Sequence, residues 1–247
     1  MLPPIFVINM ASSIERWHTT STRLHAFGLE GIRFEATVGK NLTKQEVTNW
    51  YSAELNRKRH HRNMTPGEIG CYVSHMRIWE KMRDEHIPFC IVLEDDLTIE
   101  PHLPDVINKI SELNNWDMIK LSDDRANPFI LETELSHTLT LGNYLKVPNG
   151  TQGYALSLAG ANKLLKRKPF FRPVDVDIQF HSEVNLNITG IKPYPVAEDL
   201  AFHSDIVASN NGNHSSRSTF WRNLRHRKDM YFQRKKLSAD LSNMTQK

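Results

Sequence analysis

The chain has 247 residues, of which 39% are hydrophobic and 24% are charged. This length can bury a substantial core, and the ordinary apolar share with five tryptophans argues against disorder. No stretch approaches the ~18 uninterrupted apolar residues of a membrane-spanning helix, which argues against an integral membrane protein. Only two cysteines are present, Cys71 and Cys90, so neither a disulfide scaffold nor a Cys-based zinc site is expected, and a reducing cytoplasm fits best.

The net charge of +3 is unevenly placed. Between Arg217 and Lys236 there are eight Lys or Arg residues and one acid, a local balance of +7, so the rest of the chain sums to −4. The C-terminal tail is therefore basic and the body mildly acidic, and any attraction to anionic partners is expected of the tail alone.

A strand, a helix and a second strand are expected near the N-terminus. Ile5–Asn9 is an apolar run typical of a buried strand. Ser12 and Glu15 have the spacing of a capping box for a helix that Gly28 ends, and residues 32–36 alternate as in a strand. This order favours an α/β sheet with parallel strands.

The next strong helix start is Thr65-Pro66, where Thr65 can cap the helix and Glu68 can reach back to it. Apolar residues then keep helical spacing to residue 82. Phe89–Leu93 is an apolar run of the central-strand type that ends abruptly in the acids Glu94–Asp96.

The second half continues the alternation, which predicts one α/β domain with a mostly parallel sheet flanked by helices. The Ser/Asn-rich stretch 209–218 separates this domain, residues 1–208, from a basic, aromatic-containing helical tail, residues 209–247. The remaining expected elements are a helix over 103–113, a strand over 117–121, a β-ribbon over 129–147 with a turn near Gly142-Asn143, a strand over 154–158, helices over 159–168 and 174–186, and an edge strand over 190–196, where Pro193 and Pro195 interrupt pairing.

The acids Glu94–Asp96 are the most informative feature. Alternate side chains of an extended backbone share a face, so Glu94 and Asp96 are expected to point one way and Asp95 the other. Ligands of open parallel sheets bind beyond the carboxyl ends of the strands, and crowded carboxylates there are stabilised by Mg²⁺ or Mn²⁺, which prefer oxygen ligands. The alternative is a solvated turn whose acids cap the following helix.

Two elements together resemble glycosyltransferase family 25, which comprises galactosyl- and glucosyltransferases of lipooligosaccharide biosynthesis. They are Thr65–His75 (TPGEIGCYVSH) and Ile91–Asp96 (IVLEDD). Similar pieces occur in the same order over Ile5–Ile206, namely Val7–Met10 with Glu15-Arg16, Asp117–Leu121, Gly153–Ser157 with Gly160-Ala161, Asp175–Asp177 and Ser204–Ile206.

The resemblance implies a GT-A-like (Rossmann-like) fold and an inverting transfer of a hexose from UDP-galactose or UDP-glucose to a lipooligosaccharide acceptor, with β-1,4-galactosyl transfer as the leading expectation. Glu94–Asp96 then stand where such enzymes keep a DxD motif. Asp96 is expected to ligate Mn²⁺ or Mg²⁺, Glu94 to lie near the nucleoside or the metal, and Asp95 to lie at the donor. Because the first residue is Glu, this motif departs from a literal DxD.

The reaction also needs a carboxylate within reach of the acceptor hydroxyl to take its proton. Asp177 is the preferred candidate and Asp175 the second, because both open an expected helix whose free N–H groups could face the substrate. Asp175 could instead be only an N-cap. Asp123 and Asp124 are the reserves, since they follow an expected strand.

Other residues are candidates for the donor site. Asn9 could contact uridine and Arg16 a phosphate, although Arg16 could equally be a surface residue. His75 and Ser74 could hydrogen-bond the sugar or phosphate, or simply pack inside their helix. His203 could complete the metal shell, because neutral imidazole suits Mn²⁺. His60-His61 is read as part of a flexible basic loop, since the arginines beside it would repel a cation.

The basic, aromatic tail suits an anionic membrane surface, which would place the protein in the cytoplasm on the inner face of the inner membrane. The same residues would suit nucleic-acid phosphates or a solvated helix. A nucleic-acid-binding protein would leave the TPGEIGC and EDD elements unexplained, so nucleic acid is not the expected partner. A metal-dependent phosphoesterase would need more His and Asp ligands than the spacing offers.

Overall fold

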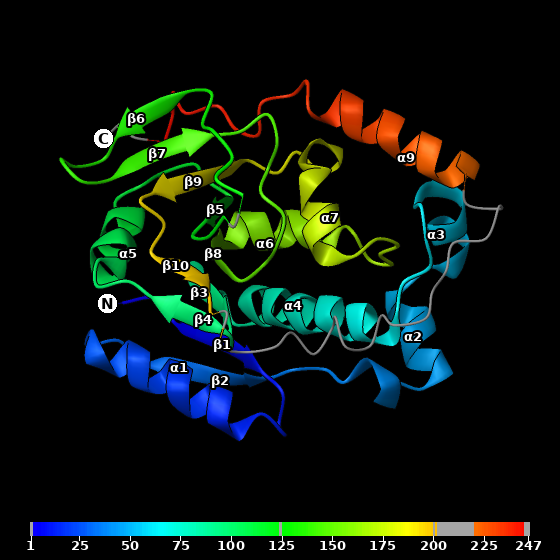
Figure 1. The fold of residues 1–247 in the computed structure, drawn as a ribbon, viewed down its shortest axis with the longest axis horizontal. Helices are drawn as coiled ribbons and strands as arrows, with labels where there is room; N and C mark the ends of the chain where they lie inside the picture. Colours follow the sequence, from blue (N-terminus) through cyan, green and yellow to red (C-terminus); the bar gives the residue numbers. More distant parts are fainter. Residues whose placement is uncertain (1, 124, 200, 202–219, 245–247) are drawn as a thin grey trace.

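The protein is described by a computed structural model, which places residues 2–123, 125–199, 201 and 220–244. An eight-stranded sheet in the order β2-β1-β3-β8-β5-β9-β7-β6 runs through the molecule, with helices on both faces, and a two-stranded sheet, β10-β4, lies beside it (Figure 1).

The strands of the large sheet are β1 (Ile5–Asn9), β2 (Gly31–Glu35), β3 (Phe89–Glu94), β5 (Met118–Lys120), β6 (Glu132–Glu134), β7 (Thr140–Asn143), β8 (Gly153–Ser157) and β9 (Ile188–Lys192). The small sheet consists of β4 (Leu97–Ile99) and β10 (Val196–Glu198). The helices are α1 (Ile14–Ala26), α2 (Lys44–Trp50), α3 (Ala53–Arg59), α4 (Pro66–Asp84), α5 (Leu103–Ser111), α6 (Leu158–Leu165), α7 (Val174–Gln179) and α9 (Phe220–Gln233), with 3-10 turns η1 (Gly39–Asn41) and η2 (His181–Glu183).

The sheet is mixed, so the expectation of a mostly parallel sheet is wrong. β1 pairs in parallel with β2 and β3, and β5 with β9, whereas the pairs β3-β8, β5-β8, β7-β9 and β6-β7 are antiparallel. The reason is that β8 runs opposite to its neighbours β3 and β5, and β7 runs opposite to its neighbours β9 and β6. Apolar runs report burial on both faces but not strand direction, so this reversal left no signal in the sequence.

Three local expectations also need correction. The Ser12–Glu15 capping box does not form, because α1 begins after Ser13, whose side chain makes no cap hydrogen bond. Gly142 and Asn143 lie inside β7, and the hairpin turn comes earlier, where the Leu135 N–H bonds the Leu139 carbonyl. The expected edge strand is instead β9, which lies between β5 and β7 and ends just before Pro193.

The start of α4 was predicted correctly. Thr65 accepts a hydrogen bond from the Glu68 N–H at 3.2 Å, and the Glu68 carboxylate accepts one from the Thr65 N–H at 2.8 Å. With Pro66 in the first turn, this capping box fixes where the helix begins.

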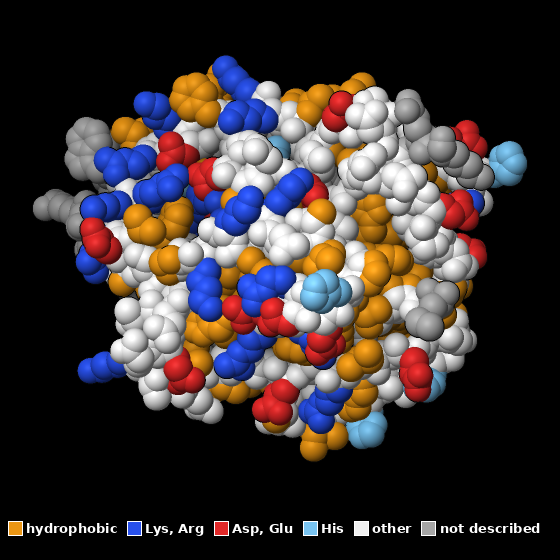
Figure 2. Space-filling model, turned by 180° about the vertical axis from the view of Figure 1, so that it is seen from behind, with side chains coloured by type: hydrophobic (Ala, Val, Ile, Leu, Met, Phe, Trp, Pro, Cys, Tyr) orange, Lys and Arg blue, Asp and Glu red, His pale blue; other side chains and the backbone are white. Residues whose placement is uncertain are grey.

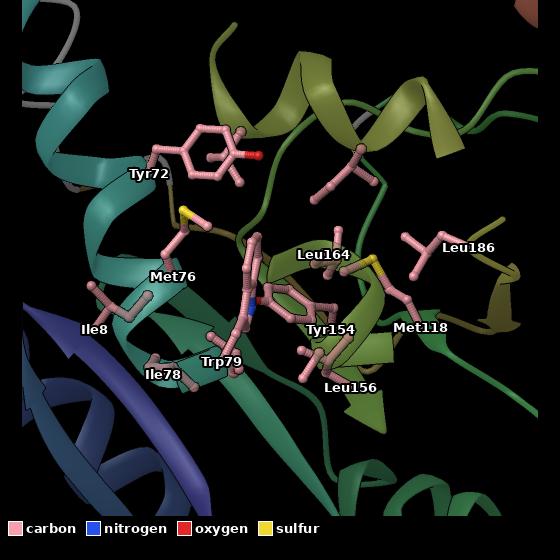
Figure 3. Packing of buried hydrophobic residues seen from close by; sticks show 14 of the residues in the cluster. Ile8, Tyr72, Met76, Ile78, Trp79, Met118, Tyr154, Leu156, Leu164 and Leu186 are labelled. Atoms are coloured by element: carbon pink, nitrogen blue, oxygen red, sulfur yellow. The ribbon is translucent and has the colours of Figure 1, made fainter. Parts of the chain in front are cut away.

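The core lies on both faces of the sheet. One cluster joins α4 and α6 to β8 and β5 and includes Tyr72, Met76, Trp79 and Tyr154, all at most 1% exposed (Figure 3). The second joins α5 to the opposite face of β1 and β3. Because α4 is packed this tightly, its N-terminal end holds a fixed position over the carboxyl edge of β1 and β3.

The described part of the basic tail packs on the body. α9 lies beside α3 (Figure 1), and Arg225 donates a hydrogen bond to the Lys58 carbonyl at 2.6 Å. Beyond α9, Ser238 bonds Tyr144 and Ile188, and Met244 is 1% exposed. The expected domain boundary at residue 208 lies outside the described residues. Among those described, no helix combines the length and apolarity needed to cross a bilayer.

Candidate active site

A cavity of about 700 Å³ opens at the carboxyl ends of β1 and β3. Four segments form its walls, and all three acids of the EDD element line it. The lining residues come from the end of β1 and the start of α1 (Ile8, Met10, Arg16), from the loop after β2 (residues 36–40), from the start of α4 (residues 64–67 with Cys71, Ser74 and His75) and from the end of β3 (Glu94, Asp95, Asp96).

The wall between η1 and α4 requires glycine. A Cβ atom on Gly39 would lie 1.7 Å from the Pro66 carbonyl oxygen, and one on Gly70 would lie 2.4 Å from the Thr37 carbonyl oxygen. These distances are below any real contact, and the obstructing atoms belong to the backbone. The TPGEIG sequence therefore combines a helix start with a bare helix face on which the loop after β2 can lie.

Glu94 is held from two sides. The Thr151 hydroxyl donates a hydrogen bond to its carboxylate at 2.6 Å, and the His75 Nε2 atom lies 3.7 Å from the same oxygen. Burial raises the pKa of Glu94, but His75, Thr151 and the buried Lys120 cation more than offset this, so the pKa lies below its usual value. Glu94 is therefore a carboxylate at neutral pH.

Asp95 serves to fix the end of β3 against β1 and α1. It accepts a 2.5 Å hydrogen bond from the Asn9 side chain, and one of its oxygens lies 3.6 Å from Arg16. Asn9 is 1% exposed and also bonds Ser13 and Arg33. Asn9 thus positions Asp95 and does not line the cavity, whereas Arg16 does. The geometry favours Arg16 as the donor contact of the two.

Asp96 carries the least compensated charge in the cavity. Its Oδ1 atom is buried and has no hydrogen-bond partner among the described residues. Burial, together with the charges of Glu94 and Asp95, raises the pKa of Asp96 to about 7. A cation beside Asp96 would remove this electrostatic conflict.

His75 and Ser74 lie on the face of α4 that lines the cavity. The His75 Nδ1 atom is 2.9 Å from the Tyr154 hydroxyl, while its buried Nε2 atom has no hydrogen-bond partner in the described part of the chain. Ser74 is already engaged, because its hydroxyl accepts from the Thr37 N–H at 2.8 Å and donates to Gly70. His75 is therefore available to a ligand, and Ser74 mainly fixes the cavity wall.

One group of potential ligands combines Cys71, His75 and Glu94, whose donor atoms lie within 4.8 Å of one another. Burial, reinforced by the surrounding carboxylates, raises the pKa of Cys71 well above its usual value. Cys71 is therefore a neutral thiol, and only the imidazole and carboxylate donors suit Mn²⁺ or Mg²⁺.

Asp177, the preferred catalytic base, is closed inside an ion-pair network. It is 3% exposed and accepts hydrogen bonds from the Tyr72 hydroxyl at 2.5 Å and from Arg172 at 2.6 Å. Arg167 lies 3.6 Å away. Both carboxylate oxygens are thus occupied, which favours a structural role for Asp177.

Asp175 is placed differently on the same helix. Its side chain is only partly buried, and burial together with the charges of Glu68 and Glu94 raises its pKa. It is not an N-cap, since α7 begins after Pro173. Asp175 is not among the residues that line the cavity, but the charge of Glu94 contributes to its raised pKa, and a raised pKa suits a proton acceptor.

The reserve and distant candidates do not join this site. Asp123 bonds its own loop through the N–H groups of Arg125 and Asn127, and it lines a separate cavity of about 260 Å³. Asp124 and His203 lie outside the described residues.

Sequence reasoning missed three residues around Glu94. Lys120 at the end of β5 is fully buried and donates a 2.5 Å hydrogen bond to the Gly150 carbonyl, while its charge reaches both Glu94 and Asp175. Thr151 and Tyr154 come from β8 and the loop before it. The sequence offered one indication of these residues, namely a lysine inside the otherwise apolar strand β5.

The part of the chain that forms the cavity resembles known proteins. The family model "Glycosyltransferase family 25 (LPS biosynthesis protein)" matches residues 2–179, which contain every described residue of the cavity. The chain is similar to a glycosyltransferase 25 family member of Drosophila pseudoobscura pseudoobscura, with 32% identity over 71% of this chain and 29% of the relative. A glycosyltransferase 25 family member of Aedes aegypti has 32% identity over 73% of this chain and 31% of the relative.

A third relative, procollagen galactosyltransferase 2 of Mus musculus, has 29% identity over 70% of this chain and 29% of its own length. The chain thus spans about a third of the length of the curated relatives it matches.

Proposed function

The chain belongs to glycosyltransferase family 25, and from this premise we propose that it moves galactose from UDP-galactose to a sugar of a lipooligosaccharide, in an inverting, divalent-metal-dependent reaction. The observation that carries the proposal is the unpartnered Asp96 carboxylate oxygen beside Glu94, inside the cavity at the carboxyl ends of β1 and β3. Crowded acids at this edge of a sheet suit a bound cation and a diphosphate.

The residues present fit a hard divalent cation. Asp96 and Glu94 line the same cavity and supply oxygen donors, and His75, which lies within 4.8 Å of Glu94, supplies an imidazole. Mn²⁺ accepts both kinds of donor readily, and Mg²⁺ accepts the oxygens. The raised pKa of Asp96 marks a carboxylate that lacks a compensating charge. When bound, such a cation would stabilise the negative charge of the departing UDP.

Groups of this chain can also bind the diphosphate directly. Arg16 and the exposed Lys40 both line the cavity, and the first turn of α4 presents Gly67 to it. A helix N-terminus favours anions because its free N–H groups and its dipole point toward them. We therefore assign Arg16, Lys40 and the α4 N-terminus to the phosphates, with Asn9 and Asp95 holding Arg16 in place.

We assign the proton-accepting role to Asp175. Its carboxylate lacks the double engagement seen for Asp177, and burial raises its pKa, which makes it a stronger base than an ordinary aspartate toward an acceptor hydroxyl. Inversion follows if that hydroxyl attacks the sugar from the side opposite the diphosphate.

Galactose rather than glucose is supported by relatives that carry the name procollagen galactosyltransferase. A glucosyltransferase of the same family is the alternative. The proposal also includes that the galactose is joined to the acceptor sugar through a β-1,4 linkage. The acceptor is assigned to lipooligosaccharide because the matching family model is described as an LPS biosynthesis protein.

We also propose that α9 attaches the enzyme to an anionic membrane, on the cytoplasmic side where lipooligosaccharide sugars would be added. Its exposed surface combines cations with apolar side chains, since Leu224, Tyr231 and Phe232 are each at least 50% exposed. Lys and Arg side chains gather on the part of the surface where α3 and α9 lie (Figure 2). Cosedimentation with anionic vesicles tests this; binding to oligonucleotides instead would favour the nucleic-acid alternative.

The experiment for the transferase is a panel of UDP-sugars incubated with the protein, with and without Mn²⁺, followed by measurement of UDP release. UDP-galactose should give metal-dependent turnover that falls at least ~100-fold in Asp96→Asn. The control, Asp84→Asn, changes an exposed aspartate on α4 and should retain full activity. Metal-independent turnover, or unchanged turnover in Asp96→Asn, contradicts the proposal.

A further inference from the structure

Three histidines from two distant segments meet at the junction of α3 and α9. His60 and His61 follow α3, and His226 lies in the middle of α9. One ring nitrogen from each lies within 4.8 Å of the others, and the ring centroids are 4.2, 4.7 and 5.3 Å apart. His60 is 1% exposed and the other two are partly buried.

Four of the six ring nitrogens in this cluster lack hydrogen-bond partners among the described residues. Both ring nitrogens of His60, Nδ1 of His61 and Nδ1 of His226 are buried and unpaired. Buried polar groups in native proteins are satisfied as a rule, so four unpaired nitrogens in one place require an explanation. One ring nitrogen from each of three histidines within 4.8 Å of the others is a spacing in which imidazoles can bind a metal ion together.

The charge state of the rings is the one a metal requires. Burial lowers the pKa of His60 to about 2 and that of His61 to about 4, with further lowering by neighbouring histidines and arginines. Burial also lowers the pKa of His226, although Asp229 partly opposes this. All three imidazoles are therefore neutral at pH 7, with lone pairs free for coordination.

Three of the arginines whose charges act on the cluster have partners of their own, which weakens their repulsion of a cation. Arg62 is paired with Glu68, and Arg172 with Asp177 and Glu183. Arg222 donates a 2.9 Å hydrogen bond to the His60 carbonyl and another to the Asn56 side chain. The expectation that the flanking arginines repel a metal from His60-His61 assumed a solvated loop, whereas the fold pairs Arg59 with Glu183 and Arg62 with Glu68.

We propose that His60, His61 and His226 bind one Zn²⁺ ion that fastens α9 to the end of α3. Three neutral imidazoles without a carboxylate suit Zn²⁺ and do not suit Mg²⁺ or Ca²⁺. Tetrahedral Zn–N bonds place the nitrogens about 3.4 Å apart, so the rings, whose nitrogens now lie within 4.8 Å of one another, would move closer on binding. Water would take the fourth position. The ion would also brace the chain leading into residues 64–67, which wall the active-site cavity.

The test uses the untagged full-length chain, stripped of metal with a chelator and titrated with Zn²⁺. Bound zinc per chain is measured by elemental analysis, and thermal unfolding is followed in parallel. His61→Ala and His226→Ala each remove one donor, and His137→Ala, a fully exposed histidine, is the matched control. An Asp96→Asn background separates this site from zinc bound at the carboxylates of the cavity.

The expected result is one tightly bound zinc in the wild type, in His137→Ala and in Asp96→Asn, with a raised unfolding temperature. Affinity should fall by more than the ~10- to 100-fold that loss of an outer-shell partner causes, in both His61→Ala and His226→Ala. Their circular dichroism without metal should match that of the metal-free wild type, which separates loss of ligands from loss of the fold.

Co²⁺ provides a second readout, since a site made of histidines gives visible ligand-field bands without the thiolate charge-transfer band that coordination by Cys71 would add. Failure of the wild type to bind zinc overturns the proposal. So does zinc that persists in both histidine variants, or a thiolate band that identifies Cys71 as the ligand.

Discussion

Replacing Asp177 and Asp175 separately by asparagine distinguishes a structural carboxylate from a catalytic one on the same short helix. Asp177 accepts hydrogen bonds from Tyr72 and Arg172 and is 3% exposed. Asp177→Asn removes the charge while keeping the shape, which leaves the Arg172 guanidinium, at 1% exposure, with Glu183 as its remaining acidic partner.

Removing one partner of a buried ion pair costs about 3–5 kcal/mol, and the retained Glu183 contact places this case near 3 kcal/mol. For a chain of this size, each kcal/mol shifts the midpoint of thermal unfolding by about 2–4 °C, so Asp177→Asn should lower it by about 6–12 °C. Asp175→Asn should change the midpoint by only about 1–2 °C, because its carboxylate is partly exposed.

The effects of the two substitutions on activity should be the reverse of their effects on stability. Asp175→Asn should lower kcat by about 10²- to 10⁴-fold, the range that general-base catalysis contributes, while Asp177→Asn assayed well below its unfolding midpoint should keep most of its activity. Differential scanning calorimetry and UDP release measure the two effects on the same samples. An Asp177→Asn protein as stable as the wild type but inactive, beside an active Asp175→Asn protein, would refute this division and make Asp177 the base.

Three further predictions follow from the geometry. Gly70→Ala should lower the free energy of unfolding by about 1–2 kcal/mol in urea titration. Alanine is the better helix former by ~1 kcal/mol, but a Cβ atom 2.4 Å from the Thr37 carbonyl oxygen costs more than that. A variant more stable than the wild type would disprove the contact. Burial raises the pKa of Glu183, but Arg172 and Arg167 more than offset this and lower it from 4.5 to about 2. The Glu183 carboxylate should therefore contribute about 3 kcal/mol of stability above pH 5, which is lost as the pH falls toward 2. In acid unfolding, Glu183→Gln should flatten this dependence of stability on pH. Burial and the charge of Glu94 raise the pKa of Asp96 to about 7, so protons should compete with Mn²⁺ for this carboxylate. The apparent Mn²⁺ affinity should therefore fall as the pH drops below 7. Calorimetric titration at several pH values measures this affinity, and an affinity that does not change with pH would contradict the prediction.

The sequence determined the elements that build the site. The capping box at Thr65 and Glu68 fixed the start of α4, and the apolar run before Glu94 fixed a buried strand that ends in acids. Both signals are local, since a helix cap and a strand end depend on residues within a few positions of each other. The family was also recognisable from these two elements, and the family model confirms it.

Only the tertiary structure decided which carboxylates are free. Asp177 and Asp175 look alike in sequence, but Asp177 meets Tyr72, which is 105 positions away in the chain, and is closed off by it. The direction of β8 and the central place of β9 likewise depend on pairing between distant strands, which apolar runs do not encode.

The histidine cluster shows the same division. His60 and His61 were visible as neighbours in the sequence, but only the packing of α9 on α3 brings His226 to them and provides the burial that keeps the rings neutral. Metal ligands and catalytic groups need convergence in space, and convergence of segments far apart in the chain is a property of the folded core.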